Sequence, residues 1–506
     1  MHILRHSSLA VTFCAVLLVV SAPSARAQDN GQTSPQDQQN QGQQAPGQQN
    51  EQQATTPIPA YHSPLASQAG DDSDEEAQPL APDTTPLSGV QNLSLGTLEN
   101  AHSYWQPHID IFGSFDSNPE EGPHGSSWGT WTSLSGGVDV HRIAGNSDLA
   151  LTYTGGGMIS SGASATNGVV QELGVVDKFT LRRWTLSLLD NLSYLPEASF
   201  GFGGLGNIGT SGGSSGLGAP FGTPGQTILT GIGQSVANAF ATEADVNLTP
   251  RTSLTFVGGY SLLHYSNTGL LDSGDASFRA GYNYLATRKD TIAVFYTFTA
   301  FRYSNFNQSI NDHTIQASYG RRVTGKLAFQ VAAGPQVAVS RVAITPGAVS
   351  GASGGATSTG SSLTQLYWSL DTNLQYQMKR TALVLSYIHG VNAGSGVLGG
   401  SVGDVASGSL TRQMSRTFSS GLTAGYSRNS GSLITSTTPV NETFDYWFAG
   451  ASFSHPIGRT LGLTLSYQMQ YQDSNSAFCI GSLCGQSVIR NLISIGVGWH
   501  ERPLLF

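Results

Sequence analysis

The feature that most constrains the fold of this chain is a set of long segments in which apolar and polar residues alternate. In residues 461–471, every odd position holds leucine, tyrosine or methionine, and every even position holds glycine, threonine, serine or glutamine. The same period of two recurs in residues 276–286, 363–378 and 417–426. A period of two places the two sets on opposite faces of a β-sheet. These segments exceed the roughly 5–6 residues of most globular strands, whereas oblique strands that cross a membrane need about 9–11.

The connections between these segments alternate in length. Short turns lie at 142–147, 181–183, 248–251, 286–290, 323–326, 378–380, 414–416 and 455–459. Longer connections rich in Gly, Ser and Asn lie near 116–127, 160–167, 195–234, 266–273, 304–310, 344–362, 392–401, 430–440 and 473–486. Outer-membrane barrels combine short periplasmic turns, longer outer loops and an even number of strands. The rhythm therefore predicts an all-β fold, a transmembrane antiparallel up-and-down β-barrel of about 18 strands, with 16 as the next possibility.

The composition agrees with a sheet that has one lipid-facing and one water-facing side. Only 11% of the residues are charged, against roughly 25% in a typical soluble domain. Glycine is frequent, with 62 residues, yet the mean hydropathy is only −0.12. Averaging an apolar exterior with a polar interior gives such a near-neutral value, whereas a helical membrane protein would be much more apolar.

Charge is distributed unevenly along the chain. Residues 1–99 hold ten acidic and two basic residues, whereas the two signs nearly balance after residue 100. No basic face of the kind that binds nucleic acid is present. Basic residues gather at or beside the short turns, where a membrane-facing charge costs least: Arg142, Arg182, Arg183, Arg251, Arg288, Lys289, Arg322, Lys379, Arg380, Arg416 and Arg459.

Residues 1–27 have the pattern of a secretory signal peptide. Arg5 precedes a short apolar core from Leu9 to Val20, and Ala25-Arg26-Ala27 fits a cleavage site before Gln28. A membrane anchor is the alternative, but the apolar core is shorter than the roughly 20 residues that span a bilayer. Export would place Cys479 and Cys484 in a compartment where a disulfide persists.

Residues 28–99 differ in composition from the rest of the chain. They are rich in Gln, Asn and Pro, and residues 71–76 read Asp-Asp-Ser-Asp-Glu-Glu. Such a sequence buries too little apolar surface to offset the entropy of ordering, which predicts a disordered acidic periplasmic tail. A tether to peptidoglycan or to a partner is the functional alternative. The barrel then occupies residues 100–506.

Residues 491–499 alternate regularly and the chain ends at Phe506. With the strand and turn pattern of residues 100–506, the chain resembles bacterial outer-membrane β-barrel proteins of the porin type. The resemblance implies an outer-membrane location in a Gram-negative-type bacterium, contact with outer-membrane lipid, and a C-terminal aromatic residue that the barrel-assembly machinery reads. Pro503 interrupts the last strand, and Phe506 is out of phase with Trp499, which departs from that pattern.

General porins fold their third outer loop into the lumen, where it forms a constriction. Connection 195–234 resembles that loop, since it is the third of the long connections and also the longest. Its only acid is Glu197 and it holds no base, so we interpret it as an outer loop, with a lumen constriction as the alternative. Cys479 and Cys484 flank four residues in the last outer loop. They are candidates for a disulfide that pins the loop, with a soft-metal site as the less favoured alternative.

The polar phase of the segments supplies candidate lumen-lining residues. They are Glu172, Asp190, Glu243, Asp245, Arg279, Arg302, Gln365, Asp371, Gln375, Gln468, Gln470 and Arg490. With so few charges among abundant Gln, Ser, Thr and Asn, the lumen suits small neutral polar solutes. The alternative is that these residues only pack the interior through hydrogen bonds.

The sequence offers no catalytic constellation, so we expect no enzyme activity, no cofactor and no metal site. His264, His313, His389, His455 and His500 lie in separate segments with no motif around them. The Gly-rich stretches lack the lysine of a phosphate-binding loop. We therefore expect an outer-membrane channel for passive diffusion of small, neutral polar solutes. The alternatives are a structural or surface-interaction barrel with a closed lumen, and an export port for a polysaccharide.

Overall fold

The computed structural model describes residues 103–119, 128–161, 167–195, 228, 234–266, 270–304, 308–342, 361–392, 394, 398–415, 417–433, 440–475 and 487–505. These residues form strands β1 (Tyr104–Asp116), β2 (Gly129–Ala144), β3 (Ser147–Ser161), β4 (Gly168–Thr180), β5 (Trp184–Leu195), β6 (Ser235–Thr249), β7 (Thr252–Tyr265), β8 (Ser273–Leu285), β9 (Asp290–Tyr303), β10 (Gln308–Thr324), β11 (Leu327–Val342), β12 (Ser361–Met378), β13 (Thr381–Asn392), β14 (Ser401–Gln413), β15 (Ser419–Leu433), β16 (Val440–Ile457), β17 (Leu461–Ser474), β18 (Ser487–His500) and the two-residue β19 (Leu504–Leu505). No helix long and apolar enough to cross a membrane occurs in the described ranges.

The strands form one closed antiparallel β-barrel. Each of β1 to β18 pairs with its neighbours in the chain, and β18 returns to pair with β1 from His108↔His500 to Asp116↔Leu492. We call this last pairing the seam. Beyond the break at Pro503, β19 pairs with the first residues of β1. Closure leaves no long strand edge unpaired, as a backbone in lipid requires, and it confirms the expected 18-stranded barrel.

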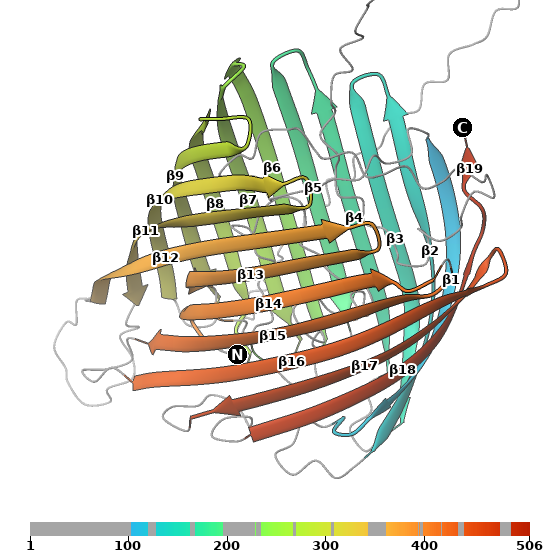
Figure 1. Ribbon diagram of the computed structural model, residues 1–506. Helices are drawn as coiled ribbons and strands as arrows, with labels where there is room; N and C mark the ends of the chain where they lie inside the picture. Colours follow the sequence, from blue (N-terminus) through green and yellow to red (C-terminus); the bar gives the residue numbers. More distant parts are fainter. Residues whose placement is uncertain are drawn as a thin grey trace, which may run out of the picture. The chain divides into compact units, whose positions relative to one another are not determined.

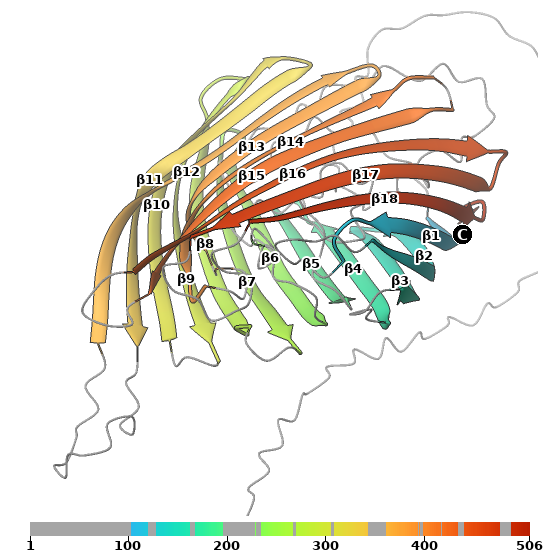
Figure 2. The same ribbon diagram turned by 90° about the horizontal axis from the view of Figure 1, so that it is seen from below.

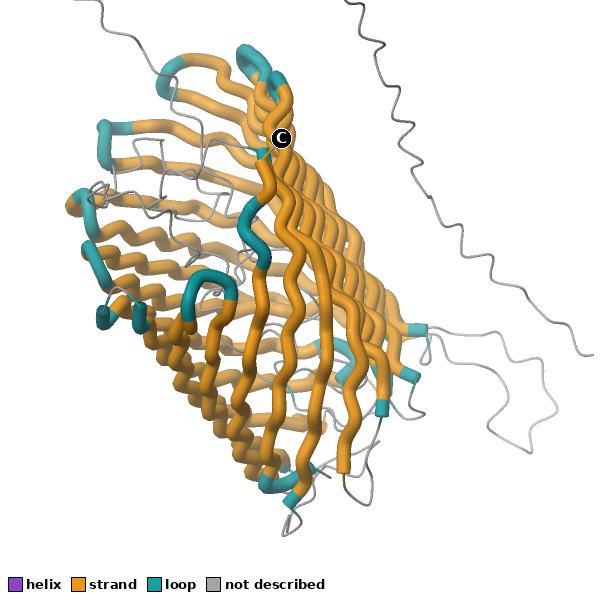
Figure 3. The backbone as a smooth tube through the Cα atoms, turned by 90° about the vertical axis from the view of Figure 1, so that its right-hand side faces the viewer, coloured by secondary structure: helices purple, strands orange, loops and turns teal. Residues whose placement is uncertain are grey.

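The closed sheet can be described as two walls of strands that join each other at both sides. In Figure 1, β12–β18 cross in front of the strands of β2–β8. Seen from below, β11–β18 follow one wall and β1–β9 the other (Figure 2). The seam lies on the side near the C-terminus, and the strands continue across it without interruption (Figure 3).

The connections follow the predicted rhythm. Short turns join β2 to β3, β4 to β5 and each later even-numbered strand up to β16 to the next strand, and longer connections join the others. Gly145 and Gly458 have positive φ values of 59° and 78° in two of these turns, a conformation that glycine adopts without strain. We call the short-turn end of the barrel its inner end and the other its outer end. The short turns connect the strands at the inner end. All eight turns predicted from the sequence are confirmed.

The outer surface of the barrel is apolar. In β18, Ile489, Ile493, Ile495 and Val497 are 43–53% exposed, whereas the residues of the opposite phase, Arg490, Leu492, Ser494 and Gly496, are buried. This arrangement is the reverse of that in a water-soluble domain, in which the apolar face is buried. The apolar band faces hydrocarbon and the polar face looks inward, so the barrel is of the outer-membrane type.

Some expectations concern parts of the chain outside the described residues. These are the signal peptide of residues 1–27, the tail of residues 28–99, most of connection 195–234, the pair Cys479 and Cys484, and the terminal Phe506. They stay predictions from the sequence.

Candidate functional site

The inward face of the barrel is the candidate functional site. Ten of the predicted lumen-lining residues are in the inward phase of their strands: Glu172, Glu243, Asp245, Arg279, Gln365, Asp371, Gln375, Gln468, Gln470 and Arg490. Glu243, Arg279, Gln470 and Arg490 are buried, and the others are half-buried. The inward face therefore has both closely packed and more open stretches.

Asp190 lies on the outward face, contrary to the sequence interpretation. It shares the phase of the exposed Leu186 and Leu192, and its register partner Phe240 is also exposed. Asn238 Nδ2 donates a hydrogen bond to Asp190 Oδ1 over 2.8 Å. The odd positions of β5 hold mainly Thr, Ser and Asn, and the even positions hold mainly Leu and aromatic residues, so the alternation itself indicates that Asp190 faces outward. The sequence interpretation selected it as a charged residue instead. The neighbouring amide compensates part of the cost of placing a carboxyl group on that face.

Arg302 also lies on the outward face, so its place among the inward candidates was wrong. It is in phase with the exposed Ile292, Val294 and Tyr296 of β9. Its guanidinium donates to Phe301 O over 2.8 Å and to Asn311 Oδ1 over 3.0 Å. Both phases of β9 are apolar, so its sequence does not reveal the phase. Arg302 lies next to the outer end of the strand, where a lipid-facing charge costs least.

The barrel brings together three predicted residues from non-adjacent strands. Glu243, Arg279 and Asp371 belong to β6, β8 and β12, and both acids interact electrostatically with Arg279. Arg279 Nε donates to Thr297 Oγ1 over 2.9 Å, and its guanidinium carbon lies 4.5 Å from the ring centroid of Phe295. A buried guanidinium with opposite charges and an aromatic face beside it is well compensated.

An apolar cluster packs beside Arg279. Val257, Phe295 and Ala332 come from β7, β9 and β11, all point inward and all are at most 3% exposed. These three side chains touch although their strands are not adjacent in the sheet. We call this region, from β7 to β11, the corner. Its inward face is closely packed and leaves little surface for a solute.

At the outer end of the seam, Asp116 and Arg490 form a buried ion pair. They are 1% and 2% exposed, and Arg490 Nε donates to Asp116 Oδ2 over 2.8 Å while Arg490 Nη2 contacts the same oxygen. Asn118 N donates to the other carboxylate oxygen over 3.0 Å. Both oxygens of this carboxylate therefore have partners.

At the inner end of the seam, four titratable side chains meet without hydrogen bonds among them: His108, Asp110, Asp139 and His500. Each is at most 9% exposed. His108 Nδ1 lies 3.5 Å from Asp139 Oδ2, and Asp110 lies 3.9 Å from each imidazole. His108 Nδ1, Asp110 Oδ1, both oxygens of Asp139 and both ring nitrogens of His500 have no hydrogen-bond partner. We call this group the inner cluster.

The sequence interpretation missed the inner cluster because it considered each histidine alone. A signal was present in residues 104–111, in which His108 and Asp110 alternate with Ile109 and Ile111. Only barrel closure brings His500 to the same place. Within the described residues, no group of three or more His, Cys, Asp or Glu is arranged to hold a metal ion.

The wall formed by β13, β14 and β15 is more open. Its inward side chains include Ser386, Ser407, Ser409, Thr411 and Thr423, which are half-buried and uncharged. Ser386 Oγ and Ser407 Oγ are 2.6 Å apart and share a hydrogen bond. We call this surface the hydroxyl wall. Its groups can donate and accept hydrogen bonds without attracting either sign of charge.

No family model and no curated protein matches this chain. Among solved structures, it is similar to OccAB3 of Acinetobacter baumannii, with 10% identity, a TM-score of 0.38, and coverage of 79% of this chain and 100% of that one. It is likewise similar to the outer membrane protein opdK of Pseudomonas aeruginosa, with 10% identity, a TM-score of 0.35 and coverage of 79% and 99%. OccK2 (OpdF) of Pseudomonas aeruginosa, solved in complex with glucuronate, shows 10% identity, a TM-score of 0.36 and coverage of 80% and 98%. With TM-scores this low, these likenesses add nothing to what the barrel's own strands show.

Proposed function

We propose that this protein is an outer-membrane channel for passive diffusion of small polar solutes, with a preference for neutral ones. The observation that carries the proposal is a closed barrel of 18 long strands with an apolar exterior and a polar inward face. A barrel of about this size is wide enough to hold an aqueous path. Solutes would pass along the hydroxyl wall, because the inward face of the corner is closely packed.

The preference for neutral solutes is inferred from the uncharged hydroxyl wall and from the pairing of the inward arginines, while further inward acids such as Asp275 and Asp312 are buried. Arg490 is paired with Asp116, and Arg279 interacts with Glu243 and Asp371. The hydroxyl wall adds no charge of its own. A path lined in this way exerts little net force on an ion, while its hydroxyl groups replace part of the hydration of a sugar-like solute.

Planar-bilayer recording of the purified protein tests the channel itself. We expect stepwise conductance increases and a reversal potential near zero in a salt gradient of KCl, because cation and anion should pass almost equally. Liposome-swelling rates should be higher for small uncharged sugars than for charged solutes of similar size. If no conductance steps occur, the channel proposal fails and a structural barrel with a closed lumen becomes the better explanation.

A substitution on the hydroxyl wall tests which surface the solutes follow. Ser407→Asp should shift the reversal potential toward cation selectivity, because it places a carboxylate on an uncharged stretch of the path. Ser407→Asn is the matched control, since it changes size and hydrogen bonding without adding charge. An unchanged reversal potential in the Ser407→Asp channel would show that ions do not pass along this wall.

A further inference from the structure

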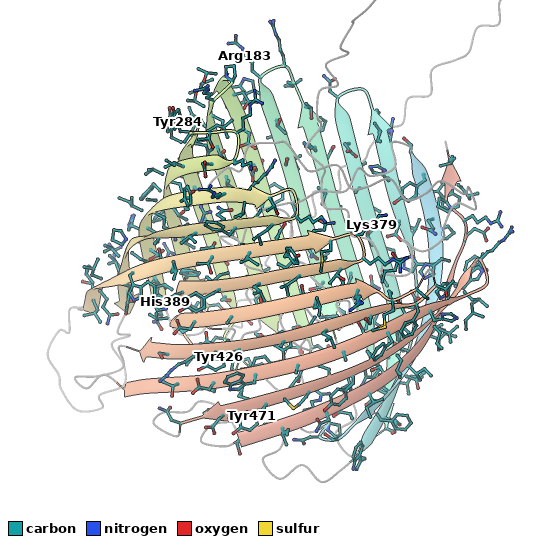
Figure 4. All side chains as sticks on the ribbon, in the orientation of Figure 1. Arg183, Tyr284, Lys379, His389, Tyr426 and Tyr471 are labelled. Atoms are coloured by element: carbon teal, nitrogen blue, oxygen red, sulfur yellow. The ribbon has the colours of Figure 1, made fainter. Side chains whose placement is uncertain are left out.

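Three short turns at the inner end of the barrel carry adjacent pairs of basic residues. The pairs are Arg182-Arg183 between β4 and β5, Arg288-Lys289 between β8 and β9, and Lys379-Arg380 between β12 and β13. We call them the basic doublets. All six side chains are exposed. Figure 4 shows Arg183 and Lys379 at the tips of their hairpins, and His389 toward the opposite end of the barrel.

The doublets lie along one part of the inner end, from β4 to β13. Consecutive doublets are separated by four strands, which is about 19 Å along the wall at a strand spacing of about 4.8 Å. Because they occupy turn tips, their charges lie beyond the ends of the strands and face the periplasm. A lipid headgroup would be met first by residues on the outward faces of the strands.

The acids described at this end of the barrel do not neutralise the doublets. Asp148 lies 2.7 Å from His141, and Asp290, which neighbours Lys289, lies 3.6 Å from Arg321. Within the described residues, none of the six doublet side chains forms an ion pair with an acid at 4.0 Å or less. The doublets therefore present a positive surface without ion-paired acids in the described residues, although Asp290 interacts electrostatically with Lys289.

The chain supplies a counter-charge of its own in residues 71–76, which hold five acids and no base. The polypeptide enters the barrel at Tyr104, whose register partner His141 lies beside the first short turn, so the preceding residues start from the inner end. Residues 77–103 can span at most about 90 Å, which brings every doublet within reach. Attachment to the same chain makes the encounter intramolecular and gives it a high effective concentration.

We propose that the acidic segment 71–76 docks on the basic doublets at the inner end of the barrel. Fully extended, the segment is about 20 Å long, so it engages one doublet or bridges two neighbours. The contact is electrostatic and exposed, and it weakens as salt shortens the screening length. Docking would hold the N-terminal part of the chain at the periplasmic rim of the barrel.

Carbodiimide crosslinking tests this contact, because the reagent joins a carboxylate to a nearby lysine amine. The full exported protein, purified in zwitterionic detergent at low salt, should give crosslinked peptides that join residues 71–76 to Lys289 and Lys379. Lys326 is an internal control, since neither of its neighbours in the sequence is basic and the nearby Arg321 is paired with Asp290. We expect about fivefold more crosslinking at the doublet lysines than at Lys326, and a loss of that excess at about 0.5 M salt.

Two variants separate docking from random encounter. Arg288→Gln and Arg380→Gln keep both doublet lysines but remove their basic neighbours, so crosslinking should fall to the level at Lys326. Heat-modifiable gel migration verifies that both variants keep a closed barrel. The proposal is overturned if the variants crosslink as well as the parent, or if Lys326 reacts as strongly as the doublets. It is also overturned if anionic-lipid nanodiscs abolish the crosslinks, because lipid headgroups would then occupy the doublets.

Discussion

The outer and inner ends of the seam carry similar residue types in different environments. At the outer end, Asp116 accepts hydrogen bonds from Arg490 and from Asn118 N, and every carboxylate oxygen has a partner. At the inner end, the two carboxylates and two imidazoles of the inner cluster lie 3.5–3.9 Å apart with six unpartnered atoms. Both ends are buried and both join β1 to β18.

This difference in hydrogen bonding indicates how much each end of the seam stabilises the closed barrel. A buried charge stabilises a structure only when its lost hydration is replaced by well-placed partners. The outer end meets this condition and holds the seam together. The inner cluster meets it less well, because its closest contact, between His108 and Asp139, is 3.5 Å long and six of its polar atoms have no hydrogen-bond partner. Between the two ends, Phe112 lies over Gly496, where a Cβ atom would overlap its ring.

The largest expected effect is at the outer end. Arg490→Met should lower the free energy of unfolding by about 3–5 kcal/mol, because Asp116 would stay buried without its cation. Urea-induced unfolding followed by tryptophan fluorescence in lipid vesicles measures the change. The double variant Asp116→Asn with Arg490→Met should regain most of the loss. If the double variant is as unstable as the single one, the ion pair is not what stabilises this end.

A second prediction concerns the lipid-facing side of the same seam. Ile495→Lys should cost about 2–4 kcal/mol of unfolding free energy, because the residue lies near the middle of β18 and faces hydrocarbon. Ile489→Lys, on the same face but at the outer end of β18, is the matched control and should cost about 0–1 kcal/mol. Equal losses in vesicle-based unfolding would contradict the assignment of this face to lipid.

A smaller effect is expected at the middle of the seam. Ser114 Oγ donates to Ser494 Oγ over 2.6 Å, and both residues are 2% exposed. Ser494→Ala should cost about 1 kcal/mol, because the Ser114 hydroxyl would be buried without this partner. Replacing both serines by alanine should cost less than the single change. A double variant that is markedly worse than either single one would argue for packing rather than for the hydrogen bond.

The smallest effect is expected at the inner cluster. Asp139→Asn removes a buried carboxylate whose oxygens have no hydrogen-bond partner and whose nearest imidazole is 3.5 Å away, so the free energy of unfolding should change by no more than about 1 kcal/mol. Asp116→Asn is the matched change at the outer end and should be clearly destabilising. A comparable loss in both variants would show that the two ends handle charge in the same way.

The barrel architecture could be predicted from the sequence because the patterns that indicate it are local. Alternation in residues 461–471 and the short turns at 181–183 and 286–290 depend only on neighbouring residues. Together they predicted the number of strands, the order of the connections and the face of ten of the twelve candidate residues. Arg302 was assigned to the wrong face because β9 carries large apolar residues in both phases. Asp190 was assigned to the wrong face for another reason: β5 does alternate, with mainly Leu and aromatic residues in its even positions, but Asp190 was chosen as a charged residue.

The tertiary structure alone decided which inward side chains meet. Asp116 and Arg490 are 374 residues apart, and only closure of the barrel brings them together. Glu243, Arg279 and Asp371 meet because the wall bends between β7 and β12, a curvature that no single strand encodes. A period of two specifies a face, since the peptide backbone imposes it locally. Contacts across the interior depend on how all the strands close on one another, which is a property of the whole sheet.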